Sequence, residues 1–457
     1  MRVDNLLLKY NRPGPRYTSY PPAPFFHTGY TAEDYKQSVI DSNYEKPENI
    51  SIYIHIPFCP RLCHFCGCNT GIAKEKNHIE RYVRALIKEI NTVSLLIDKK
   101  RPVTQVHWGG GTPNSIPFDY IVEIMDTLRA NFEFYPEAEI VMECSPAYLT
   151  LENIDTLAET GFNRISIGVQ DFHREVLDTV NRLPSRLPME ELFQYIRARG
   201  FKSINLDLIY GLPKQTPEIF TDSIKQAMAL SPDRLVTFSY AHVPWFNKSM
   251  LKLEKIGLPT TEEKFVLFGL AYEMLTSKGY VPIGLDHYAK PTDDLAIALK
   301  EHKLHRNFQG YCTRETTGQV YAFGSSGISQ LWNAYSQNIK NYQQYIEAIE
   351  NHDFAVERGY RLTKSDIICR EAINSVMCNG YLNFDEMAHQ FGISEDELKS
   401  TLQYSPGKLS EFINDGLITM ESKGIRVSQQ GMLIVRNIAM AFDPQLEVKQ
   451  SMYSKTI

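Results

Sequence analysis

The chain has 457 residues, of which 43% are apolar and 22% charged, and its formal net charge is −6. This length allows two or three domains with substantial hydrophobic cores. The weak negative charge, without a long run of Lys and Arg, disfavours a nucleic-acid partner. No signal-peptide pattern and no apolar run of membrane-spanning length are present. We therefore expect a cytoplasmic protein with no membrane partner.

Residues 1–45 are rich in Pro, Tyr, Ser and Thr. Prolines at positions 13, 15, 21 and 22 prevent one continuous helix here. Two interpretations stay open. The segment is either an arm that wraps the surface or a lid that carries Arg16 and several tyrosines over an active site.

From Ile50 onward, strand-like runs alternate with helical patterns. The strand-like runs are Ile50–Ile56, Gln105–Trp108, Glu139–Glu143, Arg164–Gly168, Ser203–Leu208 and Arg234–Tyr240. The helical patterns are Ile79–Leu96, Phe118–Asn131, Leu151–Glu159, Arg174–Val180, Met189–Arg199, Thr216–Ala229 and Glu262–Lys278. This alternation predicts a parallel sheet that curls toward a barrel. Six units rather than eight predict an incomplete α/β barrel of the (β/α)6 TIM-like type.

Four of the eight cysteines lie between Cys59 and Cys68, directly after the first predicted strand. The C-x-x-x-C-x-x-C spacing of Cys59, Cys63 and Cys66 suits thiolate ligation of a compact iron–sulfur cluster. A zinc site usually has a second cysteine pair or a histidine pair, and neither follows here. The alternatives are a zinc site and cysteines that serve only in the core or in redox chemistry. Cys68 is an occasional ligand, a residue near the substrate, or a small buried side chain. The remaining cysteines are expected to be core or incidental residues rather than ligands: Cys144, Cys312, Cys369 and Cys378.

The barrel prediction requires functional residues at the C-terminal ends of the strands, and polar or glycine-rich sequence follows all six. Gly109–Gly111 follow the second strand, where backbone groups without a nearby Cβ can approach a ligand. Glu143 and Asp207 could accept hydrogen bonds from ribose hydroxyls or an ammonium group, and Arg182 could bind a carboxylate. The alternative for each charged residue is an ordinary ion pair at the rim.

The sequence over residues 281–360 predicts an extension of the barrel with loops at the substrate site. His305 and Arg306 lie beside Phe308 and Tyr311. This combination would suit a flat polyanionic ligand, because cations bind carboxylates and rings stack. A solvated loop with two core aromatics is the alternative.

Beyond residue 360 the pattern changes to short helices followed by a hairpin and a last helix, which resembles a winged-helix module. The expected helices are Ser365–Cys378, Phe384–Gln390, Glu395–Leu402 and Leu409–Asp415, and the hairpin strands are Gly416–Met420 and Gly424–Ser428. A dense Lys/Arg stripe is absent, so a structural or lid-like role is favoured over DNA binding. The predicted organisation is an arm over 1–45, a barrel over 46–280, an extension over 281–360 and a helical C-terminal domain over 361–457.

The cysteine spacing resembles that of the radical S-adenosylmethionine (SAM) enzymes. Longer stretches are similar to one family among them, the oxygen-independent coproporphyrinogen III oxidases, also called coproporphyrinogen dehydrogenases. These stretches are Lys9–Pro21, the four-cysteine loop, His107–Pro113, Gly168–Phe172, Asp207–Thr216 and His305–Tyr311.

The resemblance implies that Cys59, Cys63 and Cys66 bind a 4Fe-4S cluster whose fourth iron is open to SAM. It implies two SAM molecules and a 5′-deoxyadenosyl radical that removes a hydrogen from a propionate of coproporphyrinogen III. Two propionates would become vinyls, giving protoporphyrinogen IX and two carbon dioxides in haem biosynthesis. An electron donor such as flavodoxin or ferredoxin is expected, and we expect a monomer.

Residue roles follow from the same resemblance. The implied contacts of the cluster-bound SAM are Tyr53, Gly110, Glu143 and Ile328. The implied contacts of the second SAM are Phe65, Gly111, Thr112, Gln170, Arg182, Asp207 and Ala241. The implied catalytic residues are Phe308, Gln309, Glu143 and Tyr53. Independently of the family pattern, we expect Arg16, His305 and Arg306 to hold substrate carboxylates.

The chain departs from the family pattern at two places on the predicted rim. Ser145 stands where the family usually has Asp, and Gly324–Ser329 differ from the typical Gly-Val-Ser-Ala-Ile-Ser. Details of second-cofactor or substrate placement depend on these residues. Two other functions stay open: a related radical SAM enzyme that methylates and opens haem, and a non-catalytic haem chaperone. The N-terminal arm and the fourth thiol favour the oxidase over the chaperone.

Overall fold

A computed structural model describes residues 3–73, 75, 77–245 and 247–446. The chain divides into two compact units. Unit 1 comprises Met1–Phe26, Phe268–Glu315 and Leu362–Ile457, and unit 2 comprises His27–Leu267 and Thr316–Arg361. The expected boundaries at 45, 280 and 360 stay a prediction. Residues 1–2 of the expected arm and 447–457 of the expected C-terminal domain lie outside the described residues.

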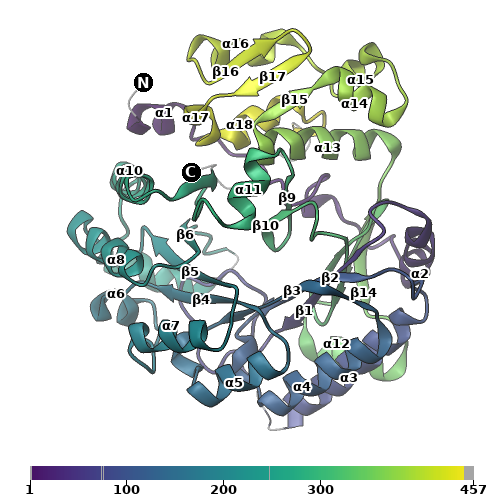
Figure 1. The fold of residues 1–457 in the computed structure, drawn as a ribbon, viewed down its shortest axis with the longest axis vertical. Helices are drawn as coiled ribbons and strands as arrows, with labels where there is room; N and C mark the ends of the chain where they lie inside the picture. Colours follow the sequence, from purple (N-terminus) through teal and green to yellow (C-terminus); the bar gives the residue numbers. More distant parts are fainter. Residues whose placement is uncertain (1–2, 74, 76, 246, 447–457) are drawn as a thin grey trace. The chain divides into compact units, whose positions relative to one another are not determined.

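Unit 2 is built on a sheet whose strands follow the order β14-β13-β12-β11-β1-β2-β3-β4-β5-β6 (Figure 1). The strands that form the predicted alternation are β1 (Ile50–Ile56), β2 (Val103–Gly110), β3 (Phe134–Cys144), β4 (Arg164–Gln170), β5 (Ser203–Tyr210) and β6 (Arg234–Ser239). All neighbouring pairs from β1 to β6 are parallel. The predicted α/β barrel-type fold is therefore confirmed, and the sheet continues past β1 instead of closing there.

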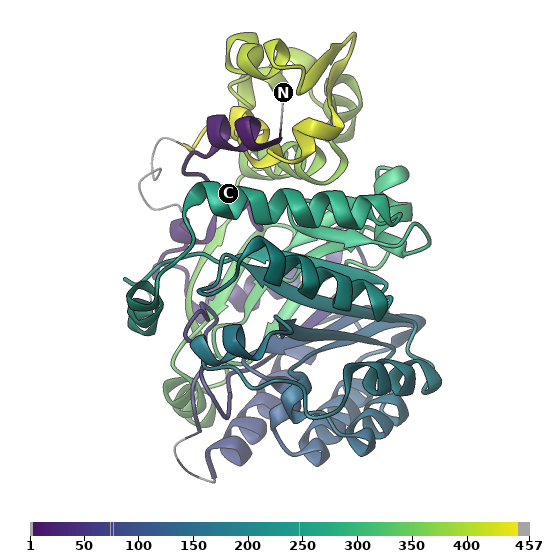
Figure 2. The ribbon, with the colours of Figure 1, turned by 90° about the vertical axis from the view of Figure 1, so that its left-hand side faces the viewer.

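Helices alternate with these strands and lie outside the curved sheet (Figures 1 and 2). They are α3 (Asn77–Ser94), α4 (Phe118–Asn131), α5 (Leu151–Glu159), α6 (Arg174–Thr179), α7 (Met189–Ala198) and α8 (Pro217–Ala229). After β6 come α9 (Leu251–Ile256) and α10 (Thr261–Ser277). β1, β4 and β5 are almost wholly buried on both faces, as parallel strands covered by helices should be.

The continuation of the sheet beyond β1 lies within the predicted extension, and the sequence did not identify its strands. β11 (Gln319–Phe323) pairs with β1 in parallel, and β12 (Ile328–Gln330), β13 (Ala334–Asn338) and β14 (Val356–Arg361) follow in antiparallel order. They lie near α12 (Tyr342–Asn351) in sequence. The sequence also missed α2 (Ala32–Asp41), although Thr31 and Asp34 form a capping box at its start.

Unit 1 contains α1 (Val3–Tyr10), two hairpins and a helical region. One hairpin is β7 (Val281–Gly284) with β8 (His287–Ala289), and the other is β9 (Leu304–Asn307) with β10 (Gly310–Thr313). α11 (Asp294–Lys300) separates them. The helical region matches the predicted one, with α13 (Lys364–Asn379), α14 (Phe384–Phe391), α15 (Glu395–Thr401), α16 (Pro406–Asn414), α17 (Gln429–Met432) and α18 (Val435–Ala439). β16 (Ile418–Glu421) and β17 (Gly424–Val427) form the expected hairpin, which β15 (Tyr381–Asn383) joins.

The N-terminal arm packs against this helical region within unit 1. The Tyr10 ring stacks on Phe412 of α16, and its hydroxyl donates to Asp415 at 2.7 Å. Tyr17 is buried and donates to Asp443 at 2.8 Å. These contacts attach residues 10–17 to the helical region of unit 1. Among the described residues no helix is both long and apolar enough to cross a membrane.

A buried carboxylate connects helix α3 to the sheet extension in unit 2. Glu89 accepts hydrogen bonds from Tyr345 at 2.6 Å, from Asn338 at 2.6 Å and from the backbone of Gly324 at 2.8 Å. Burial raises the pKa of Glu89 to about 7 despite these donors. The turn before β12 is therefore fastened to α3 by one group that titrates near neutral pH.

We expect this group to make unfolding depend on pH. Its folded-state pKa lies above the 4.5 of a solvent-exposed glutamate, so its contribution to stability is greatest below pH 4.5 and is lost as pH rises through about 7. The loss should be roughly 2–3 kcal/mol. Urea unfolding at pH 5 and pH 8 should show this extra fall for the wild type relative to Glu89→Gln. Glu80→Gln, an exposed site on the same helix, is the control; equal falls in all three proteins would contradict the expectation.

Candidate active site

The four-cysteine loop begins where β1 ends. Backbone hydrogen bonds join Cys59 to Gly71 at 2.9 Å and Gly71 to Pro57 at 2.8 Å, which closes the loop at its base. Pro57 interrupts the run of strand residues because it has no backbone N–H to donate. The loop therefore projects from the C-terminal end of β1, where the barrel prediction placed it.

Two asparagines and a backbone contact hold the loop from the opposite side. Asn181 donates to the carbonyl of Leu62 at 2.8 Å, and Asn247 donates to the carbonyl of Cys66 at 2.9 Å. The backbone N–H of His64 donates to Val180 at 2.9 Å. The sequence analysis missed both asparagines. Asn181 follows α6 with a positive φ of 58°, a conformation that Asn tolerates well, but single residues of this kind give no distinctive pattern.

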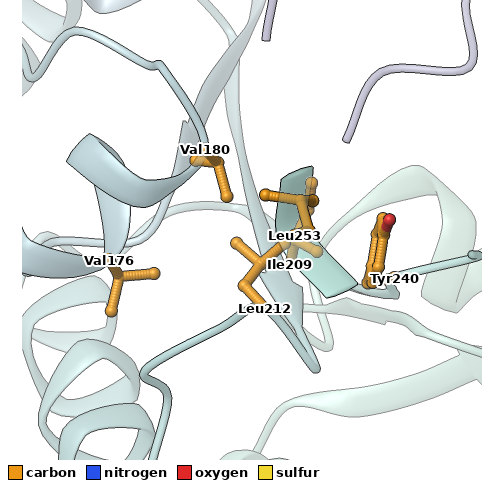
Figure 3. Packing of buried hydrophobic residues seen from close by; sticks show 6 residues of the cluster. All are labelled: Val176, Val180, Ile209, Leu212, Tyr240 and Leu253. Atoms are coloured by element: carbon orange, nitrogen blue, oxygen red, sulfur yellow. The ribbon is translucent and has the colours of Figure 1, made fainter. Parts of the chain in front are cut away.

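An apolar cluster lies beneath this attachment (Figure 3). Its buried members are Val176, Val180, Ile209, Leu212, Tyr240 and Leu253. Phe65 from the cysteine loop packs against the cluster while remaining partly exposed. The loop is thus anchored by a ring as well as by hydrogen bonds. This packing places Phe65, an expected contact of the second SAM, beside the C-terminal ends of β5 and β6.

The three predicted ligand cysteines lie within electrostatic reach of one another. Burial, together with the charges of Cys66 and Cys63, raises the pKa of Cys59 to about 11, although a hydrogen bond with Thr112 acts in the other direction. A hydrogen bond with Cys68 lowers the pKa of Cys66 to about 7. Arg182 Nη1 donates to the Cys63 sulfur at 3.6 Å. Partly exposed thiols that face one another beside a cation are suited to deprotonation on metal binding.

These thiols fit a cluster better than a single ion. In the described part of the chain, no group of three His, Cys, Asp or Glu side chains is placed to hold one metal ion. Thiolates that each bind a different iron can stand farther apart than ligands that share one ion. Gly111 leaves room beside them, because a Cβ there would come within 3.0 Å of the Cys59 sulfur. The loop therefore has the donor set that an iron–sulfur cluster requires, and Gly111 keeps a side-chain atom away from the Cys59 sulfur.

The glycine-rich turn after β2 lies directly against the base of the cysteine loop. Gly111 N–H donates to Ile56 at 2.7 Å, and Thr112 N–H donates to Phe58 at 2.9 Å. The Thr112 hydroxyl lies 3.3 Å from the Cys59 sulfur. Gly110 has a positive φ of 114°, and a Cβ there would lie 2.8 Å from the His55 ring. Only glycine fits both positions without displacing the β1 strand end.

Tyr53, His107 and Glu143 form a row across neighbouring strands. Tyr53 of β1 pairs with His107 of β2, and their rings stack with centroids 5.9 Å apart. His107 Nε2 lies 2.8 Å from Glu143 Oε1 at the end of β3. Glu143 is thus oriented by His107, which the sequence analysis did not select as a site residue although it stands in the His107–Pro113 stretch. Gly109 is required here, since a Cβ would lie 2.9 Å from the Glu143 carboxyl.

Three more predicted residues lie on β4, on β5 and after α6: Gln170, Asp207 and Arg182. Arg182 donates to the carbonyl of Gly168 as well as to Cys63, so it joins the cysteine loop to β4. Gln170 has a positive φ of 73° at the end of β4. Asp207 lies inside β5, three residues before the strand ends, and accepts hydrogen bonds from Ser166 at 3.0 Å and Asn205 at 2.7 Å. Of these residues, Arg182 is the one that contacts a ligand thiol.

The remaining predicted residues of unit 2 have these positions. Ala241 follows β6, and Ile328 begins β12. Ser326, in the turn before Ile328, lies 3.4 Å from His55 Nε2. Cys68 is exposed, so the buried-side-chain interpretation of this residue is wrong; its N–H donates to the Cys66 sulfur at 3.4 Å, in a loop that faces solvent. The four scattered cysteines are buried, as expected: Cys144, Cys312, Cys369 and Cys378.

Phe308 and Gln309 lie in unit 1, at the two-residue turn between β9 and β10. Gln309 N–H donates to the Asn307 side chain at 2.9 Å, and Gly310 takes a positive φ of 120°. The sequence analysis treated this stretch as a polar loop. In the structure it is a tight hairpin that fixes both side chains at its tip.

His305 and Arg306 are neighbours on β9, so their side chains point to opposite faces of the strand. Arg306 Nη1 donates to the Arg16 carbonyl at 2.7 Å. The pKa of His305 is lowered to about 3, first by burial and then by Arg314, with Glu371 acting in the other direction. Arg16 and Arg306 are therefore brought together within unit 1, whereas His305 faces the α13 side.

Family comparisons agree with this geometry. The profile of the Radical SAM superfamily matches residues 53–227, and that of the HemN C-terminal domain matches residues 362–434. The oxygen-independent coproporphyrinogen III oxidase of Escherichia coli (strain K12) is 41% identical over 449 residues, covering 98% of this chain and 96% of that protein. The protein of the same name from Synechocystis is 38% identical over 455 residues, covering 99% and 97%.

This chain belongs to the oxygen-independent coproporphyrinogen III oxidase family. A solved structure described as "Coproporphyrinogen III oxidase (HemN) from Escherichia coli is a Radical SAM enzyme" superposes with a TM-score of 0.89 at 39% identity, covering 97% of this chain and 99% of that one. The predicted family, fold class and enzyme class are thereby confirmed. As a radical SAM enzyme of porphyrin biosynthesis, the chain requires a 4Fe-4S cluster and SAM.

The glycine turn gives a direct test of the cluster site. In Gly111→Ala the added Cβ would lie 2.8 Å from the Phe58 carbonyl oxygen and 3.0 Å from the Cys59 sulfur, so the loop must shift. We expect iron affinity to fall by roughly tenfold or more, as when the support of a metal ligand is disturbed. Iron and sulfide per chain after anaerobic reconstitution measure this. Gly67→Ala is the matched control, since a Cβ there meets nothing within 4 Å; equal loading of the two variants would contradict the expectation.

Proposed function

We propose that this chain catalyses the oxygen-independent conversion of coproporphyrinogen III to protoporphyrinogen IX. The observation that carries the proposal is the C-x-x-x-C-x-x-C loop at the end of β1, packed on the Gly109–Gly111 turn, in a member of this oxidase family that matches 96% of the Escherichia coli relative. Curated relatives from several bacteria carry the same name at 34–41% identity. The proposed reaction turns two propionates into vinyls with loss of two carbon dioxides.

We assign the cluster to Cys59, Cys63 and Cys66. With SAM bound, the cluster would supply the 5′-deoxyadenosyl radical that starts the reaction. Arg182 beside Cys63 favours the thiolate form of that ligand. Phe65 and the apolar cluster behind it limit the access of water to one side of the loop.

Two SAM molecules are proposed, with different contacts. Tyr53, Gly110, Glu143 and Ile328 would hold the cluster-bound one. Phe65, Gly111, Thr112, Gln170, Arg182, Asp207 and Ala241 would hold the second. Glu143 is suited to an ammonium or hydroxyl group because His107 leaves its other carboxylate oxygen available. Arg182 is suited to a carboxylate because its fork already faces the rim.

At each propionate the substrate loses one hydrogen atom, one carbon dioxide and one electron. A hydrogen atom leaves the propionate carbon next to the ring and appears in 5′-deoxyadenosine. The substrate radical then loses carbon dioxide and passes one electron to an acceptor, which leaves the vinyl group. We propose Phe308 and Gln309 as residues that act on the substrate, and Arg16, Arg306 and His305 as candidates for its carboxylates. For Arg16 and Arg306 the support is their contact within unit 1.

We further propose that a flavodoxin or ferredoxin supplies the reducing electron and that the chain works as a cytoplasmic monomer. Free thiols at the cluster loop need a reducing compartment for cluster assembly. The departure at Ser145 does not disturb its own backbone, because Asn114 pairs with both its N–H, at 2.9 Å, and its carbonyl, at 3.1 Å.

An anaerobic assay tests the function. Reconstituted protein, reductant and SAM are supplied with coproporphyrinogen III or with haem, and the tetrapyrrole and 5′-deoxyadenosine are quantified. We expect divinyl product from coproporphyrinogen III, and in Cys63→Ala the loss of iron and of turnover together. Turnover by a preparation without the cluster would refute the mechanism. A methylated linear tetrapyrrole from haem, or haem bound and unchanged, would show a different function.

His107 should act as a positioning residue for Glu143. In His107→Ala the 2.8 Å contact is lost, and we expect affinity for SAM to fall by roughly tenfold while iron content stays unchanged. Equilibrium binding of SAM to the reconstituted protein measures this. His173→Ala serves as the control. It removes a histidine at the start of α6, which pairs with Asp222 of α8. Loss of iron together with SAM binding would indicate a general structural defect.

A further inference from the structure

Two buried arginines in unit 1 hold the backbone of the N-terminal arm. Arg306 of β9 donates from Nη1 to the carbonyl of Arg16 at 2.7 Å. Arg436 of α18 donates to the carbonyls of Pro15 at 3.2 Å and Gly14 at 2.8 Å. Both arginines are more than nine-tenths buried, with 8% and 7% of their surface exposed. Their guanidinium groups therefore converge on three consecutive arm residues, and Arg16 itself extends from that segment with an exposed side chain.

Charged groups of both signs act on Arg436. The charges of Arg16 and Arg306 both lower the pKa of Arg436, after burial as the first cause, and Asp286 opposes them. Arg306 in turn acts on Asp286, whose nearest partner is His287 at 2.7 Å. Asp443 accepts the hydroxyl of Tyr17, the next residue of the arm. Arg16, Arg306 and Arg436 therefore repel one another, and an anion bound beside them would relieve that repulsion.

Hydrogen-bonding capacity is also unused here. In the described part of the chain, Arg306 Nε and the Tyr311 hydroxyl are buried without a hydrogen-bond partner. The Arg306 guanidinium lies over the Tyr311 ring, 5.2 Å from its centroid. Tyr311 is pressed against Gly284, where a Cβ would lie 2.4 Å from its hydroxyl oxygen. An N–H and an O–H that are both available beside these guanidinium groups match the two oxygens of a carboxylate.

We propose that Arg16, Arg306, Arg436 and Tyr311 form a binding site for a propionate that the substrate keeps through the reaction. This inference rests on the proposed function. A guanidinium stabilises the carboxylate anion, so it would oppose departure of the bound group as carbon dioxide. The site is therefore suited to one of the two propionates that remain in the product. Arg436 and Tyr311 are new assignments, and His305, on the other face of β9, takes no part.

Porphyrins with different carboxylates test the site without turnover. The full chain with its reconstituted cluster, kept anaerobic without SAM or reductant, is titrated with coproporphyrin III, with protoporphyrin IX, which has only the two retained propionates, and with coproporphyrin tetramethyl ester. Arg16→Gln, Arg306→Lys and Arg436→Lys should each weaken binding of the two acids by roughly tenfold to hundredfold and leave ester binding unchanged. Arg12→Gln, on the same arm but paired with Glu411 at 3.2 Å, should bind like the wild type.

The outcomes separate this inference from the function. If the variants lose affinity for coproporphyrin III but not for protoporphyrin IX, the site holds a departing propionate and the inference fails. If the wild type converts coproporphyrinogen III while the three variants bind all porphyrins as the wild type does, the inference fails and the function stands. If the wild type neither binds nor converts it, the proposed function itself fails. Arg16→Gln changes an exposed side chain, so its result does not depend on refolding around Arg306 or Arg436.

Discussion

The attachment of the cysteine loop to the strand ends is the constraint on which the catalytic unit depends. A loop of ten residues that carries four thiols has little hydrophobic surface of its own, so its shape must come from outside. β1 and the glycine turn fix its base, while Asn181, Asn247 and the apolar cluster fix its far side. Because both sides are fastened, the thiols can be held in place before any metal binds.

The same strand ends explain why glycine recurs beside the loop. At Gly109, Gly110 and Gly111 a Cβ would meet, respectively, the Glu143 carboxyl, the His55 ring and the Phe58 carbonyl. Each glycine thus serves a different neighbour, although the three are consecutive in sequence. Close approach of β1, β2 and β3 at this point is what brings thiols, a tyrosine and a carboxylate to one rim.

Much of unit 2 could be predicted from the sequence because its elements have strong local signals. The apolar runs of β1 to β6 and the helices between them agree with the structure to within a few residues, apart from the longer β3. The strands β11 to β14 could not be identified, because they are short and interrupted by polar residues, and their place is set by pairing with β1, which lies far away in sequence. The partners His107, Asn181 and Asn247 were missed for the same reason. Their importance depends on contacts across the fold, and no local pattern marks them.

Unit 1 shows a related limit. The sequence suggested cations and rings at His305–Tyr311, but only the hairpin shows that His305 and Arg306 face opposite sides of β9. Arg436 lies 130 residues after Arg306 in the numbering, in a short helix with no motif of its own. Its proximity to the arm is a tertiary fact that spacing does not reveal.

The anchoring of the arm through main-chain carbonyls has an evolutionary consequence. Arg306 and Arg436 bind oxygens that every amino acid possesses. Side chains at positions 14 and 15 could therefore diverge among related proteins as long as the backbone keeps its path. Arg436 should resist replacement even by lysine, whose single ammonium group cannot span two successive carbonyls in the same way.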